Sequence, residues 1–289
     1  MSNKEYKIDK NVTIAQGVII KKNVTIKEGT IIGKNVTIED NVYIDYDCII
    51  RDNVHIKEGS FIGVRSILGE YLMDFYKDKT NKIHPLVIGK NALIRTENVI
   101  YGDTVIGDNF QSGHKVTIRE NTKIGNNVKI GTLSDIQGYC KVGNYVSIHS
   151  NVHIGQKSEI NDYVWIFPYV VLTNDPTPPS DKLIGVIIDS YAIISTGSII
   201  LPGVYIHSDA LVGAGAVVTK DVPKETLVLG NPSKEICSVK EIKNKDTGES
   251  VYPWRYTFKR GMPWEDSNYE SWIQDVELVA EKNVGEKNV

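Results

Sequence analysis

A branched apolar residue returns at every sixth position over the first quarter of the chain, without interruption. A period of six matches neither the two of a plain strand nor the 3.6 of a helix, so the repeating unit is larger than either. The pattern predicts a solenoid. The residues of this first series are Ile8, Ile14, Ile20, Ile26, Ile32, Ile38, Ile44, Ile50, Ile56, Ile62 and Leu68.

The other positions of each hexad indicate a short strand followed by a corner. A second small or apolar residue, such as Val24 or Val36, stands two positions before the Ile, so inward and outward side chains alternate as in a strand. Gly often follows the Ile, as at Gly33 and Gly63, and we expect it to permit the bend. Asn or Asp comes soon after, as is typical of turns.

Three such strands close a triangular coil of eighteen residues. Stacked coils pair their backbones about 4.8 Å apart, so residues eighteen positions apart are predicted to lie in one column. Handedness does not follow from the spacing.

Length and composition suit one elongated domain. The chain has 289 residues, 41% of them hydrophobic, and we expect a coil over residues 1–232 with a cap and tail over 233–289. A net charge of −3 indicates no general attraction to nucleic acid or anionic lipid. Cys48 and Cys140 occupy inward positions, which favours buried apolar fillers over disulfides or metal ligands.

The first residues, Met-Ser-Asn-Lys-Glu-Tyr, lack the apolar centre of a signal peptide. No apolar run approaches the roughly 18 residues of a membrane span. We therefore expect a cytoplasmic protein.

Two loop excursions interrupt the period, over residues 69–87 and 173–187. The first carries Tyr71, Phe75 and Tyr76, which suit stacking on a base, packing against another subunit or packing on the coil itself. The second contains Asn174-Asp175-Pro176-Thr177-Pro178-Pro179, whose prolines stiffen it into a defined arm.

Beyond Ser233 the period ends and aromatic residues accumulate. We expect a short helix from Ser267 to Ala280, disorder over 281–289, and a cap that covers the open end of the coil, where strand edges would otherwise be exposed.

One position of the second series, which runs from Ile88 to Leu172, is polar. Ser112 stands where an apolar inward residue is expected, which indicates a distorted corner or a site, because local rules often break at functional positions. His114 follows two residues later, and Thr132 and Ser150 lie eighteen and thirty-six positions beyond it. The column predicts an imidazole flanked by hydroxyls, a candidate general base. An isolated surface His, however, commonly has no chemical role.

Several motifs between Ile88 and Ser233 carry a resemblance to a known family. They are Val99-Ile100-Tyr101, Gly107-Asp108-Asn109-Phe110, Gly113-His114, Ile118-Arg119-Glu120, Thr173-Asn174-Asp175-Pro176, Ser195-Thr196-Gly197-Ser198, Gly213-Ala214-Gly215-Ala216 and Gly230-Asn231-Pro232-Ser233. The chain resembles the hexapeptide-repeat acyltransferases, and among them the nucleotide-linked amino-sugar N-acetyltransferases of the dTDP-3-amino-3,6-dideoxyhexose type. The fold that this implies is all-β, a left-handed parallel β-helix.

The resemblance also implies an activity, which is acyl transfer from acetyl-CoA or another acyl-CoA to the amine of a dTDP- or UDP-linked amino sugar, for glycan biosynthesis. No metal is implied, and a homotrimer is. His114 is the expected base, unless the departing CoA thiolate collects the proton. Expected substrate contacts are Arg95, Tyr101, Phe110, Gln111, Glu120, Thr132, Ser150, Asn174 and Asp175, and expected CoA contacts are Ser195, Thr196, Gly197, Gly213, Ala214, Lys220 and Pro232.

Three other readings remain open. An O-acetyltransferase acting on a sugar hydroxyl or serine fits the CoA-binding segments equally well. A γ-carbonic-anhydrase-like metalloenzyme would use His114, His149 and His153, but whole turns require a spacing of 36, so His149 falls one position out of column and we expect its side chain to point elsewhere. A purely structural solenoid is disfavoured by the Ser112 break and the two excursions.

Overall fold

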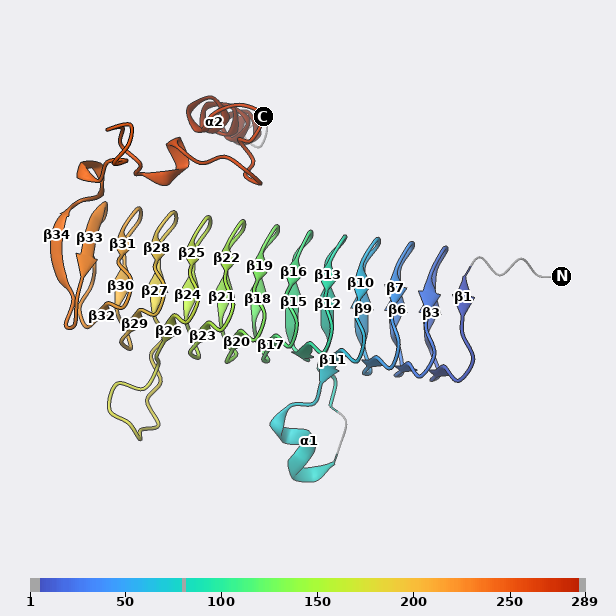
Figure 1. The fold of residues 1–289 in the computed structure, drawn as a ribbon. Helices are drawn as coiled ribbons and strands as arrows, with labels where there is room; N and C mark the ends of the chain where they lie inside the picture. Colours follow the sequence, from blue (N-terminus) through green and yellow to red (C-terminus); the bar gives the residue numbers. More distant parts are fainter. Residues whose placement is uncertain (1–5, 80–81, 286–289) are drawn as a thin grey trace.

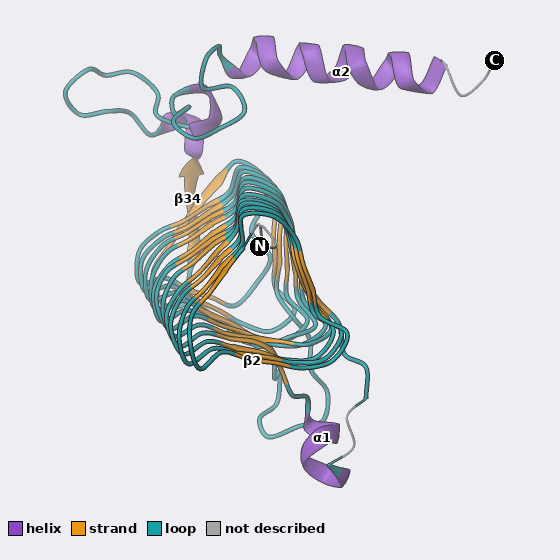
Figure 2. Ribbon diagram, turned by 90° about the vertical axis from the view of Figure 1, so that its right-hand side faces the viewer, coloured by secondary structure: helices purple, strands orange, loops and turns teal. Residues whose placement is uncertain are grey.

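The hexads wind into a three-sided parallel β-helix, as predicted (Figures 1 and 2). The computed structural model describes residues 6–79 and 82–285. Pairing proceeds in steps of eighteen residues, as in Lys7↔Thr25. Across the excursions the steps lengthen, to Phe61↔Leu93 and Trp165↔Ile193, so the columns continue past both.

Each side of the prism is one sheet. Sheet A contains β1 (Lys7–Ile8), β4 (Thr25–Ile26), β7 (Tyr43–Ile44), β10 (Phe61–Ile62), β13 (Leu93–Ile94), β16 (Gln111–Ser112), β19 (Lys129–Ile130), β22 (Ser147–Ile148), β25 (Trp165–Ile166), β28 (Ile193–Ile194), β31 (Leu211–Val212), β33 (Thr226–Leu229) and β34 (Lys234–Ser238). Sheet B contains β2 (Thr13–Ile14), β5 (Ile31–Ile32), β8 (Ile49–Ile50), β11 (Ile67–Glu70), β14 (Val99–Tyr101), β17 (Thr117–Ile118), β20 (Asp135–Ile136), β23 (His153–Ile154), β26 (Val171–Leu172), β29 (Ile199–Ile200) and β32 (Val217–Val218). Sheet C contains β3 (Ile19–Ile20), β6 (Thr37–Ile38), β9 (Val54–Ile56), β12 (Leu86–Ile88), β15 (Thr104–Ile106), β18 (Lys123–Ile124), β21 (Lys141–Val142), β24 (Glu159–Ile160), β27 (Ile187–Ile188) and β30 (Tyr205–Ile206).

The sixth-position residues form the core inside the prism. Ile26, Ile44 and Ile62 are fully buried, whereas Ile8 and Ile14 in the first coil remain 36% and 40% exposed. The first coil has a neighbouring coil on one side only, so burial begins with the second. Cys48 and Cys140 are also fully buried, and burial raises the pKa of each thiol to about 11, in agreement with their predicted role as fillers.

The roles of Gly and Asn at the corners differ from the prediction. Asn35 takes the left-handed backbone conformation, with φ of 55°, and similar Asn and Asp residues do so at other corners. Gly33 is needed for a different reason, since a Cβ there would lie 2.7 Å from the backbone nitrogen of Asp52 in the next coil. A residue such as Gly33 is therefore small because the coils approach closely at that point, and the bend is made further into the corner by a left-handed residue such as Asn35 or Gly29.

Both excursions leave the edge between sheets B and C, and Figure 1 shows them projecting on the same side of the coil. The first contains a helix that the pattern did not predict, α1 (Met73–Asp78). The second is an arm closed by a hydrogen bond from the Ile184 N–H to the Asn174 carbonyl, at 2.8 Å.

The C-terminal segment lies along the side of the prism, contrary to the prediction that it covers the open end. At the open end, β34 covers the edge of β33 by antiparallel pairing. The chain then passes through η1 (Val239–Glu241) and η2 (Trp254–Tyr256) and turns back over the edge between sheets C and A (Figures 1 and 2). There the Trp254 indole donates to the Tyr191 carbonyl, at 2.8 Å.

The segment ends in helix α2 (Tyr269–Gly285), which extends five residues past the predicted Ala280. The disorder predicted for 281–289 is therefore wrong up to Gly285, and residues 286–289 lie outside the described part. Neither described helix combines the length and the apolarity that a membrane crossing requires.

Candidate active site

The edge between sheets A and B, called the A–B edge below, carries the predicted column. The N–H of Leu133 donates to the His114 carbonyl and the N–H of Asn151 to that of Thr132, so successive corners stack in register. Thr96, His114, Thr132 and Ser150 therefore follow one another along this edge. The same ladder continues through Pro168 and Thr196 to Ala214.

His114 is held by its neighbours in this column. Its Nδ1 and the Thr96 Oγ1 are hydrogen-bonded at 2.7 Å, and its backbone N–H donates to the Thr132 Oγ1 at 3.2 Å. The residue as a whole is exposed. With Nδ1 engaged by Thr96, Nε2 is the nitrogen left to face a substrate.

A polar pocket of about 380 Å³ surrounds this part of the edge. It unites five residues predicted for the acceptor site with three that were not assigned to it. The predicted ones are Arg95, Gln111, His114, Thr132 and Ser150, and the additional ones are Lys129, Ser147 and His149.

Ser112 is both a distortion of the coil and part of this pocket. Its side chain is buried, and its Oγ accepts the Arg95 N–H at 3.1 Å, which replaces the usual carbonyl acceptor of the ladder. The freed Ser112 carbonyl accepts a hydrogen bond from the Arg95 guanidinium at 2.7 Å. The register of β13 on β16 accordingly includes Leu93↔Gln111 alone. The polar break thus positions Arg95 at the pocket.

His149 lines the pocket as well, and the prediction that its side chain points elsewhere is wrong. It stands one position out of the His114 column, beside Gly131, where a Cβ would lie 2.4 Å from the His149 backbone. Its ring stacks on Phe167 with centroids 4.7 Å apart, and its buried Nε2 has no hydrogen-bond partner in the described part of the chain. Burial lowers the pKa of His149. A His that follows Gly113 and Gly131 in one column was the available signal.

Lys129 and Ser147 stand at outward positions of β19 and β22, next to Gln111 in the sheet A row. The strand alternation could have identified them, because outward residues of the strands leading to the His114 edge must share its face.

Among the described residues, no group of three or more His, Cys, Asp or Glu side chains is arranged to hold a metal ion.

Four of the predicted acceptor contacts lie on the opposite edge of sheet B. Glu120 pairs with Arg119 at 2.9 Å, and the Arg119 guanidinium lies over the Tyr101 ring. In the arm, Asp175 accepts hydrogen bonds from the Ser180 hydroxyl and from the N–H groups of Ser180 and Thr177, and the Ser180 hydroxyl is the main cause of its lowered pKa. Asp175 thus organises the arm, next to Asn174. Within one chain these residues do not meet His114.

Phe110 belongs to the core. Its ring is fully buried among inward residues, two positions before Ser112, so in this structure it has no surface to offer a substrate.

The residues expected to contact CoA divide between two places. Five of them lie on the A–B edge, in line with His114: Ser195, Thr196, Gly197, Gly213 and Ala214. Lys220 is exposed after β32 at the far edge of sheet B, and Pro232 is exposed between β33 and β34. A Cβ on Gly197 would meet nothing within 4 Å, so this part of the edge is open.

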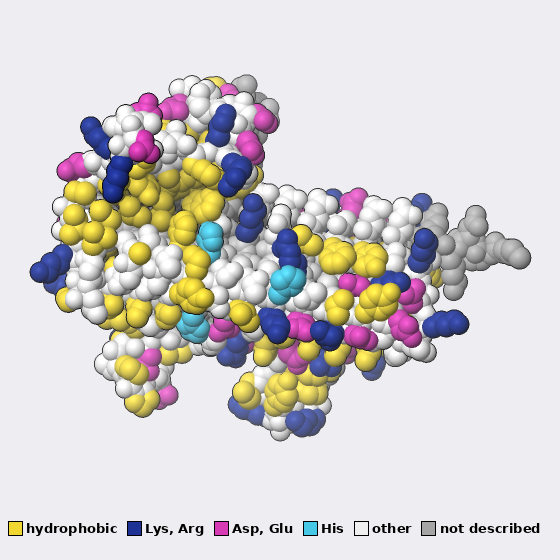
Figure 3. Space-filling view, viewed as in Figure 1, with side chains coloured by type: hydrophobic (Ala, Val, Ile, Leu, Met, Phe, Trp, Pro, Cys, Tyr) yellow, Lys and Arg dark blue, Asp and Glu magenta, His cyan; other side chains and the backbone are white. Residues whose placement is uncertain are grey.

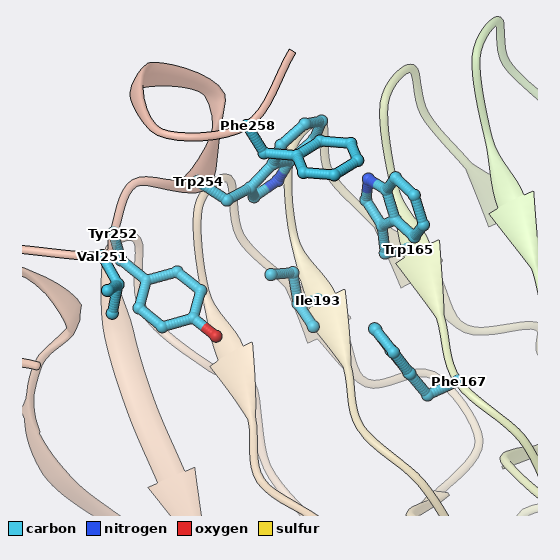
Figure 4. A pocket seen from close by; sticks show the side chains of 7 residues that line it. All are labelled: Trp165, Phe167, Ile193, Val251, Tyr252, Trp254 and Phe258. Atoms are coloured by element: carbon cyan, nitrogen blue, oxygen red, sulfur yellow. The ribbon is translucent and has the colours of Figure 1, made fainter. Parts of the chain in front are cut away.

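An aromatic pocket of about 230 Å³ lies next to the polar one (Figure 4). Sheet A supplies one wall and the C-terminal segment the other. The lining residues are Trp165, Phe167, Ile193, Val251, Tyr252, Trp254 and Phe258. Sequence reasoning did not find it, because no periodic signal places the C-terminal segment beside β25.

Comparison with known proteins identifies the repeat. The family model described as bacterial transferase hexapeptide (six repeats) matches residues 29–64 and 113–156. The putative acetyltransferase C18B11.09c of Schizosaccharomyces pombe is 56% identical over 43 residues, 15% of this chain and 21% of that protein. The 2,3,4,5-tetrahydropyridine-2,6-dicarboxylate N-acetyltransferase of Staphylococcus aureus strain bovine RF122 / ET3-1 is 40% identical over 81 residues, 28% of this chain and 32% of that protein. The chain thus matches about a fifth to a third of the length of these relatives.

Similar solved structures include the UDP-N-acetylglucosamine O-acyltransferase of Moraxella catarrhalis RH4, with a TM-score of 0.48 and 20% identity over 97% of this chain and 91% of that one. Another is PerB of Caulobacter crescentus in complex with CoA and GDP-perosamine, with a TM-score of 0.22 and 24% identity over 50% of this chain and 59% of that one. The chain carries, in two segments of its coil, the hexapeptide repeat of the bacterial transferases.

Proposed function

We propose that this protein transfers an acyl group from acyl-CoA to the amine of a nucleotide-linked amino sugar, and that it does so in the cytoplasm for glycan biosynthesis. The observation that carries the proposal is the Thr96–His114 pair, set in a polar pocket on the A–B edge. The acetyltransferase names of the matched relatives support acyl transfer, and the N-acetyltransferase among them supports an amine acceptor.

The reaction is one direct displacement. The amine nitrogen attacks the thioester carbonyl, the nitrogen–carbon bond forms and the carbon–sulfur bond breaks. His114 Nε2 accepts the proton that the nitrogen loses, and the leaving CoA thiolate is protonated afterwards. The N–H groups of Gly131 and Leu133 donate to the carbonyls of Ile148 and His114 in neighbouring coils. We assign the N–H of Thr132, which stands between them in the chain, the role of oxyanion donor.

The open part of the A–B edge is the proposed path of the donor. Thr196 lies four turns beyond His114 and Ala214 five, about 19 and 24 Å along the coil at about 4.8 Å a turn. Small exposed residues there allow a thin pantetheine chain to lie against the backbone. Its thioester would then reach the polar pocket.

A homotrimer explains why the expected acceptor contacts lie on two edges. Sheet B presents an uncovered row of outward apolar side chains that includes Ile31, Ile49, Ile67 and Val99. If three copies turn this sheet to a common axis, the A–B edge of one copy meets the B–C edge of the next. Asn174 and Tyr101 of one protomer then approach His114 of its partner.

The test is CoA release with a panel of acceptors: dTDP- and UDP-linked amino sugars, the corresponding hydroxy sugars, and serine. Amino sugars should be acylated, and His114→Asn should lower kcat about 100-fold or more. His55→Asn on sheet C is the matched control and should keep full activity. Acylation of hydroxyl acceptors alone would establish O-transfer instead, and an unchanged kcat in His114→Asn would remove His114 as the base.

A further inference from the structure

The polar pocket contains two cations, Arg95 and Lys129, that no carboxylate of the described residues neutralises. The Arg95 guanidinium donates a hydrogen bond to the Ser112 carbonyl, and Lys129 is exposed on the sheet A row. Within residues 6–79 and 82–285 neither forms an ion pair with Asp or Glu, although surface lysines elsewhere on the coil do, such as Lys141 with Glu159. Two unpaired cations in one pocket favour an anionic ligand.

The aromatic pocket continues this surface. Trp165 follows Lys129 and Ser147 in the same outward row, two turns further along sheet A. The His149–Phe167 stack lies between the two pockets. On the other side, Gly261 of the C-terminal segment comes next to the Lys129 ammonium. On this face, Figure 3 shows Lys, Arg and His side chains next to a broad apolar area.

The lining of the aromatic pocket suits a flat ring with a polar rim. Ring faces and edges from Trp165, Trp254 and Phe258 enclose one side, and Ile193 forms the floor (Figure 4). The Tyr252 hydroxyl points into this space, and burial raises its pKa, so it stays a neutral donor and acceptor. A nucleobase combines apolar faces with a hydrogen-bonding edge, whereas an acyl chain would leave the hydroxyl unused.

We propose that the aromatic pocket binds the base of the acceptor nucleotide, with its diphosphate on Lys129 and Arg95 and its sugar at His114. The inference rests on the proposed function and adds the location of the nucleotide. From Trp165 to Gln111 is three turns, about 14 Å, which an extended nucleoside diphosphate sugar spans. Donor and acceptor then approach His114 over different surfaces, the donor along the A–B edge and the acceptor across sheet A.

Binding of UDP and dTDP alone tests this without catalysis. Trp165 and Trp254 line the pocket, so a bound base should quench tryptophan fluorescence, and calorimetry should give the Kd. Phe258→Ala should weaken UDP and uridine alike, roughly five- to 150-fold, the usual range for one base stack. Lys129→Ala should weaken UDP but leave uridine unchanged.

Matched controls separate these effects from general damage. Tyr43→Ala removes another stacked aromatic of the same sheet face, and Lys123→Ala another outward lysine, and both should bind UDP as the wild type does. Tyr252→Phe removes one hydroxyl and should weaken UDP without affecting folding.

Three results would overturn the inference: UDP binding that is unchanged in Phe258→Ala and Tyr252→Phe, displacement of UDP by adenosine 3′,5′-diphosphate, or protection of the pocket by long-chain acyl-CoA alone. His114→Asn should still bind UDP. If nucleotides bind here and no amino sugar is acylated, the proposed function fails and the pocket assignment stands. If amino sugars are acylated but the Kd for UDP is unchanged in Phe258→Ala, the proposed function stands and the pocket assignment fails.

Discussion

The Nδ1 of His114 lies 2.7 Å from the Oγ1 of Thr96, its counterpart in the preceding turn of the coil. This contact orients the imidazole and leaves Nε2 toward the pocket, so Thr96 is a positioning residue. Thr96→Val should lower kcat about tenfold, the loss of roughly one hydrogen bond, with little change in KM. Thr96→Ser should restore it. A Thr96→Val enzyme with the wild-type pH–rate profile and kcat would show that the contact has no catalytic role.

Ser112→Ile restores the repeat at its single polar position. The buried hydroxyl disappears, and the Arg95 N–H can pair with the carbonyl of residue 112 as on other rungs, so the Arg95 guanidinium loses its acceptor. We expect the free energy of unfolding to stay within about 1 kcal/mol of the wild-type value or to rise, while kcat/KM for the nucleotide sugar falls. Loss of stability with unchanged kinetics would make Ser112 a structural feature alone.

Charging the outward face of sheet B should separate the proposed trimer. Ile31→Lys/Ile67→Lys places two cations in an interface that favours apolar residues, and light scattering after size exclusion should show a monomer with little activity. The control is Ile19→Lys/Val105→Lys on sheet C, where the native residues are 57% and 46% exposed. A wild-type protein that is already monomeric would contradict the placement of acceptor contacts across two chains.

The excursion around α1 should respond to pH through His84. Its Nε2 lies 2.9 Å from Asp74 and its Nδ1 2.6 Å from Asp103, and Lys82 also pairs with Asp74. Burial alone would lower the pKa of His84, but the two carboxylates outweigh it and raise that pKa above 6.5. The hydrogen bond to His84 is the main reason that the pKa of Asp74 lies below 3.8.

The sign of each shift gives the pH window. The His84 contribution is complete below about pH 6.5 and is lost as pH rises through its raised pKa, and the Asp74 contribution is lost as pH falls below about 3.8. The protection factor of the α1 amides, which corrects the exchange rate for its intrinsic pH dependence, should therefore be largest between these limits and fall above neutrality. His84→Ala should abolish the dependence, whereas His55→Ala should retain it.

Arg255 attaches the C-terminal segment to the coil through a buried pair with Asp209. Its guanidinium also lies over the rings of Tyr191, Tyr256 and Tyr269. Asp209→Asn leaves a buried cation without its counter-charge and should cost about 3–5 kcal/mol in urea unfolding followed by tryptophan fluorescence. Glu159→Gln breaks an exposed pair and should cost less than about 1 kcal/mol. Equal losses in the two variants would contradict the anchoring role.

Several of these features were accessible from periodicity, because a column is a property of spacing. His114, Thr132 and Ser150 were predicted to align and do. Phe110 shows the limit of motif resemblance, since it lies inside the core although it belongs to a shared motif. His149 shows the limit of column arithmetic, because a residue one position out of register still faces the same pocket from the rim of sheet A.

The sequence by itself determined the coil, its core and the order of residues along each edge, because inward Ile residues and Asn corners are local signals that repeat in register. Tertiary structure decided where the C-terminal segment lies and thus that Trp254 and Phe258 face Trp165 across a pocket. That contact joins residues some ninety positions apart through one packing of aromatic rings, and a single non-repeating contact leaves no period for a sequence to display.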